Sequence, residues 1–135
     1  MVVNIRCVID TSIIIEVFDK GKSNLLDYLL SRCDEIFIPW VVLYEYLYGH
    51  KYLGKPITKR KEVLEKLGTI LWINQEIIER ALDIDVGLHK EGTPIPFSDI
   101  LISSTALQLN SELITLNERH YRRIKNLRIH VPKLE

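Results

Sequence analysis

The 135-residue chain lacks most features that mark a specialised class of protein. Its two cysteines, Cys7 and Cys33, form no C-x-x-C pair and have no histidine-rich companion segment. A zinc site is therefore a poor interpretation and a disulfide framework a poorer one, and Cys7 is expected to be a small buried hydrophobic residue. No apolar run approaches the roughly 20 residues that span a bilayer, and the N-terminus lacks the pattern of a signal peptide. These absences predict a reduced, cytoplasmic protein that does not enter a membrane.

An excess of charge of one sign is also missing, because 18 basic residues balance 18 acidic ones. Net charge therefore gives no argument for or against binding to nucleic acid. Hydrophobic residues make up 47% of the chain, which is enough for a packed interior. No linker, repeat or low-complexity tract interrupts the sequence, so we expect a single domain over residues 1–135.

Short apolar segments alternate along the chain with longer segments of helical periodicity. The apolar segments predict strands at 5–9, 35–38, 69–73, 112–116 and 128–131. The intervening segments predict helices at 11–18, 24–32, 40–48, 58–67, 75–90, 99–109 and 117–124. We expect Asn74 and Ser98 to cap two of these helices, and Gly49 and Gly68 to end two others. The alternation predicts an α/β sandwich with a mainly parallel sheet, whose ligands bind where the strands end.

Three carboxylates lie within or beside otherwise apolar runs that contain no Lys or Arg, namely Asp10, Glu45 and Asp99. A carboxylate in apolar surroundings is costly unless its charge is compensated. Asp10 follows a predicted strand, and the helices that carry Glu45 and Asp99 start near the same edge of the sheet. Three acids brought together there would repel one another unless a divalent cation lay between them. The sequence thus predicts a metal site.

Each acid also has a purely structural interpretation. Asp10 could cap the following helix, and Asp99 could complement the dipole of its own helix. Glu45 lies in the middle of a helix, where neither explanation applies, although a half-exposed helix face would solvate it. All three structural explanations would have to hold together for the metal site to be wrong.

Basic and aromatic residues form the remaining patterns. One basic group surrounds the middle loop and helix, where an ordinary solvated surface is the simpler interpretation, and comprises Lys51, Lys55, Lys59, Arg60 and Lys61. A second group follows Asn117 and comprises Arg119, His120, Arg122, Arg123, Lys125 and Arg128. Cations beside a carboxylate cluster suit a substrate with phosphates. Four tyrosines, Tyr44, Tyr46, Tyr48 and Tyr52, could stack on bases, but their helical spacing favours packing in a core or interface.

Four motifs in this order resemble those of the PIN-domain ribonucleases. They are VIDTS at 8–12, YEYLYG at 44–49, PIPFSDILISSTA at 94–106 and LITLNERHY at 113–121. Each motif is weak alone, but together they cover nearly the whole chain. In length and compactness the chain is most similar to the toxin half of VapBC-type toxin–antitoxin modules.

The resemblance implies a sheet of about five parallel strands and a site for Mg²⁺ or Mn²⁺ held by Asp10, Glu45 and Asp99. It also implies hydrolysis of RNA, with Ser12 and Thr115 orienting ligands or water. Arg119, Arg122 and Arg123 are then the candidates for RNA contact. The implied partners are a second copy of the chain and an antitoxin, for which the helix 40–52 is the candidate lining.

Asn117 departs from the resemblance, because it stands where many relatives carry a fourth acid. Its neutral oxygen leaves three negative charges, so a second metal ion would bind weakly or only with substrate. This departure supports an alternative, a weak or inactive PIN-like module that binds RNA or protein. A phosphoacceptor receiver domain and a haloacid-dehalogenase-type phosphatase fit poorly. The first needs an acid where Asn74 stands, and the second an Asp where Ser12 stands.

Overall fold

A computed structural model describes residues 4–134 as a five-stranded sheet in the order β3-β2-β1-β4-β5, with every neighbouring pair parallel. The strands are β1 (Arg6–Ile9), β2 (Glu35–Pro39), β3 (Thr69–Leu71), β4 (Glu112–Ile114) and β5 (Ile129–His130). The chain starts in the central strand, builds outward to β3, and then returns to add β4 and β5 on the other side. The direction of the connections reverses between β1 and β4, which is where such sheets bind ligands. The predicted parallel α/β sandwich is confirmed.

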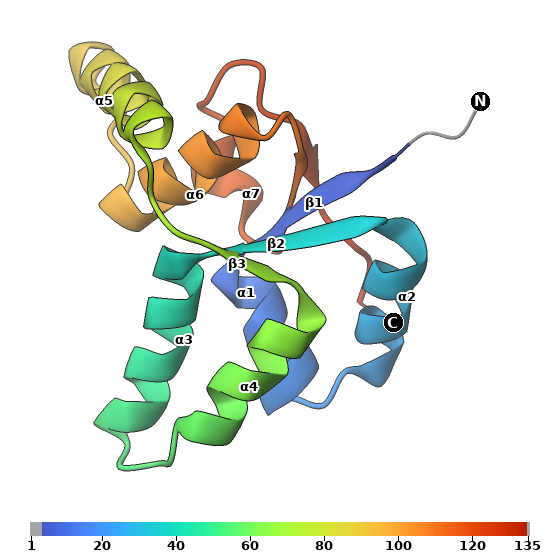
Figure 1. The fold of residues 1–135 in the computed structure, drawn as a ribbon. Helices are drawn as coiled ribbons and strands as arrows, with labels where there is room; N and C mark the ends of the chain where they lie inside the picture. The colour runs from blue at the N-terminus through green and yellow to red at the C-terminus, as the bar shows by residue number, and fades with distance from the viewer. Residues whose placement is uncertain (1–3, 135) are drawn as a thin grey trace.

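Helices cover both faces of the sheet (Figure 1). They are α1 (Thr11–Ile14), η1 (Ile15–Asp19), α2 (Ser23–Arg32), α3 (Trp40–Tyr52), α4 (Thr58–Leu67), α5 (Gln75–Lys90), α6 (Phe97–Gln108) and α7 (Glu118–Tyr121). In the view of Figure 1, α5, α6 and α7 lie above the sheet, and α1 to α4 lie below it. Within residues 4–134, none of these helices is both long and apolar enough to cross a membrane.

The core explains why the three central strands are apolar beyond their first residue. Val8 and Ile9 of β1, Ile38 of β2, and Leu113 and Ile114 of β4 are completely buried. Strands of a parallel sheet are covered on both faces, so both faces must be apolar. Burying each such side chain is worth about 1.5–3 kcal/mol relative to exposure.

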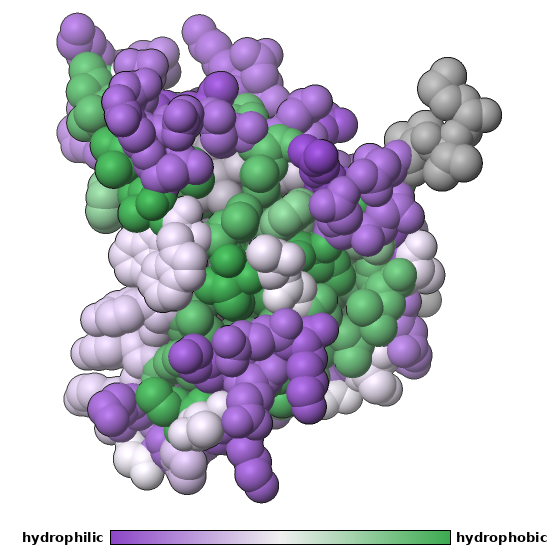
Figure 2. All heavy atoms as spheres, viewed as in Figure 1, coloured by the Kyte–Doolittle hydropathy of each residue, from purple (hydrophilic) through white to green (hydrophobic). Residues whose placement is uncertain are grey.

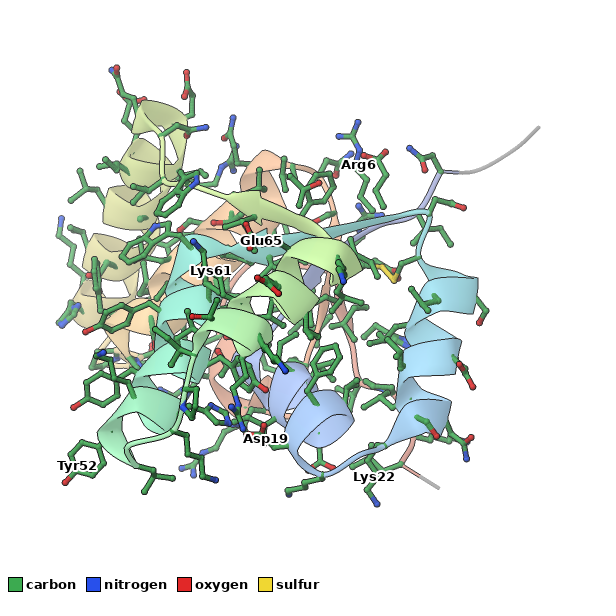
Figure 3. All side chains as sticks on the ribbon, turned by 60° about the horizontal axis from the view of Figure 1, so that its bottom comes forward. Arg6, Asp19, Lys22, Tyr52, Lys61 and Glu65 are labelled. Atoms are coloured by element: carbon green, nitrogen blue, oxygen red, sulfur yellow. A yellow bond between two sulfur atoms is a disulfide. The ribbon has the colours of Figure 1, made fainter. Side chains whose placement is uncertain are left out.

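The helix predicted at 117–124 covers only Glu118–Tyr121, and two of the four predicted helix caps and stops are wrong. The helix that starts at Trp40 continues through Gly49 to Tyr52. Its last turns are fixed from outside: the Tyr46 hydroxyl donates to Asp19 Oδ1 over 2.9 Å, and His50 Nε2 lies 3.1 Å from the same oxygen. Asp19, labelled in Figure 3, ends the π-helical turn η1, in which Lys20 N donates to Ile15 O. Tertiary contacts therefore override the low helix propensity of Gly49.

The other error concerns Ser98, which lies inside the first turn of α6, after Pro96 has taken the capping position. Asn74 does cap α5, because its side chain accepts a hydrogen bond from Ile77 N over 2.9 Å. Gly68 follows α4 as predicted, but its φ of −165° is extended, whereas helix-ending glycines usually adopt the left-handed conformation.

The cysteines are also predicted wrongly, because Cys7 and Cys33 form a disulfide (Figure 3). Their Cα atoms are 5.9 Å apart, within the range that a disulfide spans. Cys7 is in the central strand and completely buried, as expected. Cys33 directly follows α2, where the chain turns back to form β2 beside β1. The sequence spacing carries no sign of this proximity, which depends on how α2 packs.

Candidate active site at the carboxyl edge of the sheet

Asp10 and Thr115 directly follow the ends of two neighbouring strands, β1 and β4. In the register of β1 and β4, Ile9 pairs with Ile114, so the next residue of each strand emerges at the same point of the edge. Thr115 Oγ1 donates to Asp10 Oδ2 over 2.8 Å, and Ser12 Oγ donates to the same oxygen over 2.8 Å. The two residues that were predicted to support the site therefore both bind Asp10, which is only 6% exposed.

Asp99 is held from the opposite side by the short helix α7. The Tyr121 hydroxyl donates to Asp99 Oδ1 over 3.2 Å and to Asp10 Oδ1 over 3.0 Å. His120 Nδ1 lies 2.8 Å from Asp99 Oδ2. Carboxylates from β1 and α6 are thus brought close enough for one hydroxyl to contact both. Burial and the two negative charges raise the pKa of Tyr121, so its hydroxyl stays protonated and can donate.

Glu45 reaches the same region from α3. Its Oε1 accepts a hydrogen bond from Thr11 Oγ1 over 2.8 Å. Burial raises the pKa of Glu45 above its ordinary value of 4.5, and the charges of Asp10 and Asp99 raise it further. Hydrogen bonds from Thr11 and Ser98 act in the opposite direction. Ser98, which does not cap its helix, is thus a neighbour of the Glu45 carboxyl.

The compensation of these charges is incomplete. Among residues 4–134, neither Asp10 nor Glu45 forms an ion pair, and Asp99 has only the His120 ring. In the same residues, no three His, Cys, Asp or Glu side chains are yet arranged to ligate one ion. Each carboxylate oxygen has two lone pairs. An oxygen that accepts only one hydrogen bond therefore keeps a lone pair with which it could bind a cation. The donor set, hard oxygens of opposing carboxylates, fits Mg²⁺ or Mn²⁺ better than zinc.

The remaining predicted residues do not contact the three acids, and they lie just before α7, on it or just after it. The backbone N–H of Asn117 donates to Thr115 Oγ1 over 2.9 Å, whereas the Asn117 residue is exposed. Arg122 pairs with Glu118 at 2.6 Å, and Arg123 donates to the carbonyl of Pro94 over 3.0 Å. Arg119 is exposed on the same short helix. The structure thus places Asp10, Asp99, Ser12 and Thr115 in one hydrogen-bonded network, with Glu45 beside it.

Sequence reasoning gave no role to Thr11 or Tyr121, predicted Ser98 only as a helix cap, and placed His120 only in a basic group beside the acids. Thr11 and Ser98 are next to predicted acids, and their positions could have suggested a role in orienting them. Tyr121 gave no such signal, because an aromatic residue on a short helix looks the same whether it fills the core or binds carboxylates.

Comparison with known proteins supports a family assignment. The PIN domain family matches residues 7–126. The chain is 32% identical to "Ribonuclease VapC" of Rickettsia bellii over 90% of this chain and 92% of the relative. It is 28% identical to "VapC ribonuclease PF0355" of Pyrococcus furiosus over 83% of this chain and 74% of the relative.

Solved structures agree with the fold. A chain of VapBC-1 from nontypeable Haemophilus influenzae has a TM-score of 0.82 at 25% identity, covering 94% of this chain and 98% of its own. A chain of VapBC2 from Rickettsia felis, bound to a DNA fragment from the promoter, has the same TM-score of 0.82 at 21% identity, covering 96% and 100%. The chain therefore belongs to the PIN domain family, in which its curated relatives are VapC ribonucleases.

Proposed function

We propose that this protein is a metal-dependent ribonuclease, the toxin of a toxin–antitoxin module, which hydrolyses RNA phosphodiesters at Asp10, Glu45 and Asp99. The names of its relatives support the ribonuclease activity. The observation that carries the metal dependence is electrostatic. Three carboxylates from β1, α3 and α6 interact at one edge of the sheet, and Asp10 and Glu45 have no ion-pair partner within residues 4–134.

The three acids have distinct supports in this proposal. Asp10 is oriented by Ser12 and Thr115, Glu45 by Thr11, and Asp99 by His120. When bound, Mg²⁺ or Mn²⁺ would supply a water of lowered pKa and polarise the scissile phosphate. Buried hydrogen bonds hold Asp10 in place before the substrate arrives, which reduces the reorganisation needed for the reaction. Water as the nucleophile leaves a 5′-phosphate and a 3′-hydroxyl.

The RNA backbone is proposed to approach across α7. Arg119, Arg122 and Arg123 are exposed and lie on or directly after α7, the helix whose His120 and Tyr121 contact the acids. Their charges can offset the repulsion between a phosphate and the carboxylates. Asn117, exposed between Thr115 and this helix, is available to the substrate as a neutral hydrogen-bonding group.

Cleavage of an end-labelled RNA with Mg²⁺, with Mn²⁺ and with EDTA tests the proposal. We expect cleavage only with a cation, and a loss of at least about a hundredfold in Asp10→Asn and in Asp99→Asn. Asp27→Asn, which changes an exposed carboxylate on α2, is the matched control and should cut like the parent. Equal cleavage by all variants, or a 2′,3′-cyclic phosphate product, contradicts the proposed chemistry.

An inactive binding module of the same fold is the second candidate, and Asn117 is the observation that favours it. The discriminating result is binding without cleavage. If the parent retains RNA in a filter assay yet produces no fragments with either cation, the second candidate replaces the first.

Two apolar surfaces support the proposed partners. The first is a groove of about 510 Å³, lined by Trp40, Leu43, Tyr44, Leu47, Tyr48, Lys51, Tyr52, Ile57 and Trp72. Its rings are exposed, with Tyr48 56% and Trp72 70% accessible. The second is a stripe on α5, formed by Ile78, Leu82 and Val86, which are 45%, 59% and 49% exposed. In Figure 2, which has the view of Figure 1, pale, weakly polar residues cover the left side around α3, and green, apolar residues lie along α5 at the upper left.

We assign the tyrosine-lined groove to an antitoxin segment and the α5 stripe to a second copy of the chain. The similar solved structures are VapBC assemblies, and this supports the proposal that this chain binds an antitoxin. Glu45 lies on the same helix, α3, but it lines a different hollow, together with Asp19 and Gly49. Exposed apolar patches of this kind are typical of interaction sites.

Two substitutions separate these assignments. Leu82→Glu should give a monomer in light scattering and still co-purify with the short protein encoded beside the gene. Tyr48→Glu should lose that protein and remain a dimer. The reverse pattern would exchange the two surfaces, and a parent that is monomeric and without such a partner would contradict both.

A further inference from the structure

Tyr121 makes a bridge between Asp10 and Asp99, two of the three acids of the site. Its hydroxyl is 3.0 Å from Asp10 Oδ1 and 3.2 Å from Asp99 Oδ1, and the residue is only 1% exposed. Asp10 and Asp99 are 89 positions apart in the sequence and come from opposite layers of the fold. Their relative position is therefore not set by any local geometry of the chain.

Each of the two carboxylates has a divided set of donors. One oxygen of each faces Tyr121, and the other is bound separately: Asp10 Oδ2 by Ser12 and Thr115, and Asp99 Oδ2 by His120. Three of these donors, Thr115, His120 and Tyr121, come from one short stretch of chain. This stretch leaves β4, turns, and forms α7 above the site.

Two carboxylates this close repel each other and would turn apart if nothing restrained them. A single buried hydroxyl that donates toward both oxygens offsets part of the repulsion. It also limits the rotation of both side chains, because a tyrosine ring packed in the core cannot follow them. Among residues 4–134, no other side chain hydrogen-bonds to both acids.

We propose that Tyr121 is a positioning residue, which holds the carboxylates of Asp10 and Asp99 at a fixed spacing so that they bind one divalent cation together. The inference rests on the proposed function, since it concerns the same metal site. It assigns to Tyr121 a role in metal affinity and in the chemical step, and no direct contact with RNA. Residues that hydrogen-bond to metal ligands act in this way, and their loss costs about 10–100-fold in affinity or activity.

Tyr121→Phe tests this role because it removes one oxygen and leaves the packed ring. Tyr46→Phe is a matched control: Tyr46 is also buried, and its hydroxyl also donates to a carboxylate, that of Asp19. The first measurement is Mn²⁺ binding by calorimetry without RNA. We expect at least about tenfold weaker binding in Tyr121→Phe and unchanged binding in Tyr46→Phe.

The second measurement is steady-state cleavage of a short RNA. In Tyr121→Phe we expect kcat to fall about 10–100-fold while KM stays within about twofold, because the hydroxyl does not touch the substrate. Melting in EDTA checks that both variants are folded. A merely structural role of Tyr121 would lower the melting temperature without the selective loss of Mn²⁺ affinity.

The outcomes separate the inference from the function on which it rests. If the parent binds Mn²⁺ and cuts RNA but Tyr121→Phe does both equally well, the inference alone is wrong. If both tyrosine variants lose Mn²⁺ to the same extent, the effect is not specific to the bridge and the inference is also wrong. If the parent binds no Mn²⁺, the proposed function fails and the inference fails with it.

Discussion

Thr115 donates a hydrogen bond to Asp10 over 2.8 Å. This bond joins the ends of β4 and β1, the two strands between which the order of the connections reverses. Thr115 also accepts a bond from the N–H of Asn117. A completely buried hydroxyl thus orients the central acid and, at the same time, shapes the loop that leads to α7.

Thr115→Val should therefore damage both stability and activity. Valine has the same shape but leaves a carboxylate and a backbone N–H each short of a partner, which costs about 1–3 kcal/mol of unfolding free energy. Urea denaturation and RNA cleavage measure the two effects. Thr105→Val is the control, because the buried Thr105 hydroxyl bonds only to the Leu101 carbonyl within α6. Cleavage by Thr115→Val at the parental rate would show that Thr115 has no part in orienting Asp10.

Gly68 presents a different kind of constraint, namely a close approach to β2. A Cβ atom at this position would lie 2.5 Å from the Ile36 carbonyl oxygen and 2.8 Å from Ile36 Cγ2. Because backbone atoms cannot move aside cheaply, we expect Gly68→Ala to lower the unfolding free energy by about 1–3 kcal/mol.

Gly87→Ala is the matched control for this prediction. A Cβ at Gly87 meets nothing within 4 Å, and the residue lies inside α5. Alanine there should raise the unfolding free energy by up to about 1 kcal/mol, because it is a better helix former than glycine. Equal stability of the two variants in urea denaturation would refute the steric explanation.

The outline of the fold could be predicted because it depends on local patterns. Continuous apolar segments such as that ending at Ile9 indicate buried parallel strands, and the segments between them have helical periodicity. The errors at Gly49 and Ser98 have different causes. Distant contacts of Tyr46 and His50 with Asp19 hold α3 together past Gly49, and the extended backbone of Pro96 starts α6 two residues before Ser98.

The candidate site could be predicted in part for the same reason. Asp10 and Thr115 follow strands, and parallel strands end at one edge, so their meeting is a consequence of the sheet. The bridge through Tyr121 and the disulfide of Cys7 with Cys33 depend on the packing of helices against that sheet. No spacing in the sequence contains that information.

The disulfide leads to a prediction about stability. It connects residues 26 positions apart, and closing a loop of that length restricts the unfolded chain enough to stabilise the fold by about 3–4 kcal/mol. Cys7→Ser with Cys33→Ser, or treatment with a reductant, should lower the urea midpoint accordingly. Two free thiols in the denatured, unreduced protein would contradict the pairing.

Glu45 gives the last prediction, which concerns pH. Burial and two neighbouring acids raise its pKa in the folded protein above the ordinary 4.5. Below pH 4.5 the carboxyl is protonated in both states. As the pH rises, the unfolded chain ionises first, so stability is lost until the pH passes the folded pKa. At pH 7 in EDTA, Glu45→Gln should therefore melt at a higher temperature than the parent.

The difference should shrink below pH 4.5, where neither protein carries a charge at this position. Glu65→Gln, an exposed change on α4 (Figure 3), should not show this dependence. Addition of Mn²⁺ should stabilise the parent and not Glu45→Gln. The ionised Glu45 carboxylate destabilises the metal-free protein, but the same carboxylate is proposed to bind the cation. A metal-free parent as stable as Glu45→Gln at pH 7 would mean that the ionisation of Glu45 carries no cost to the fold.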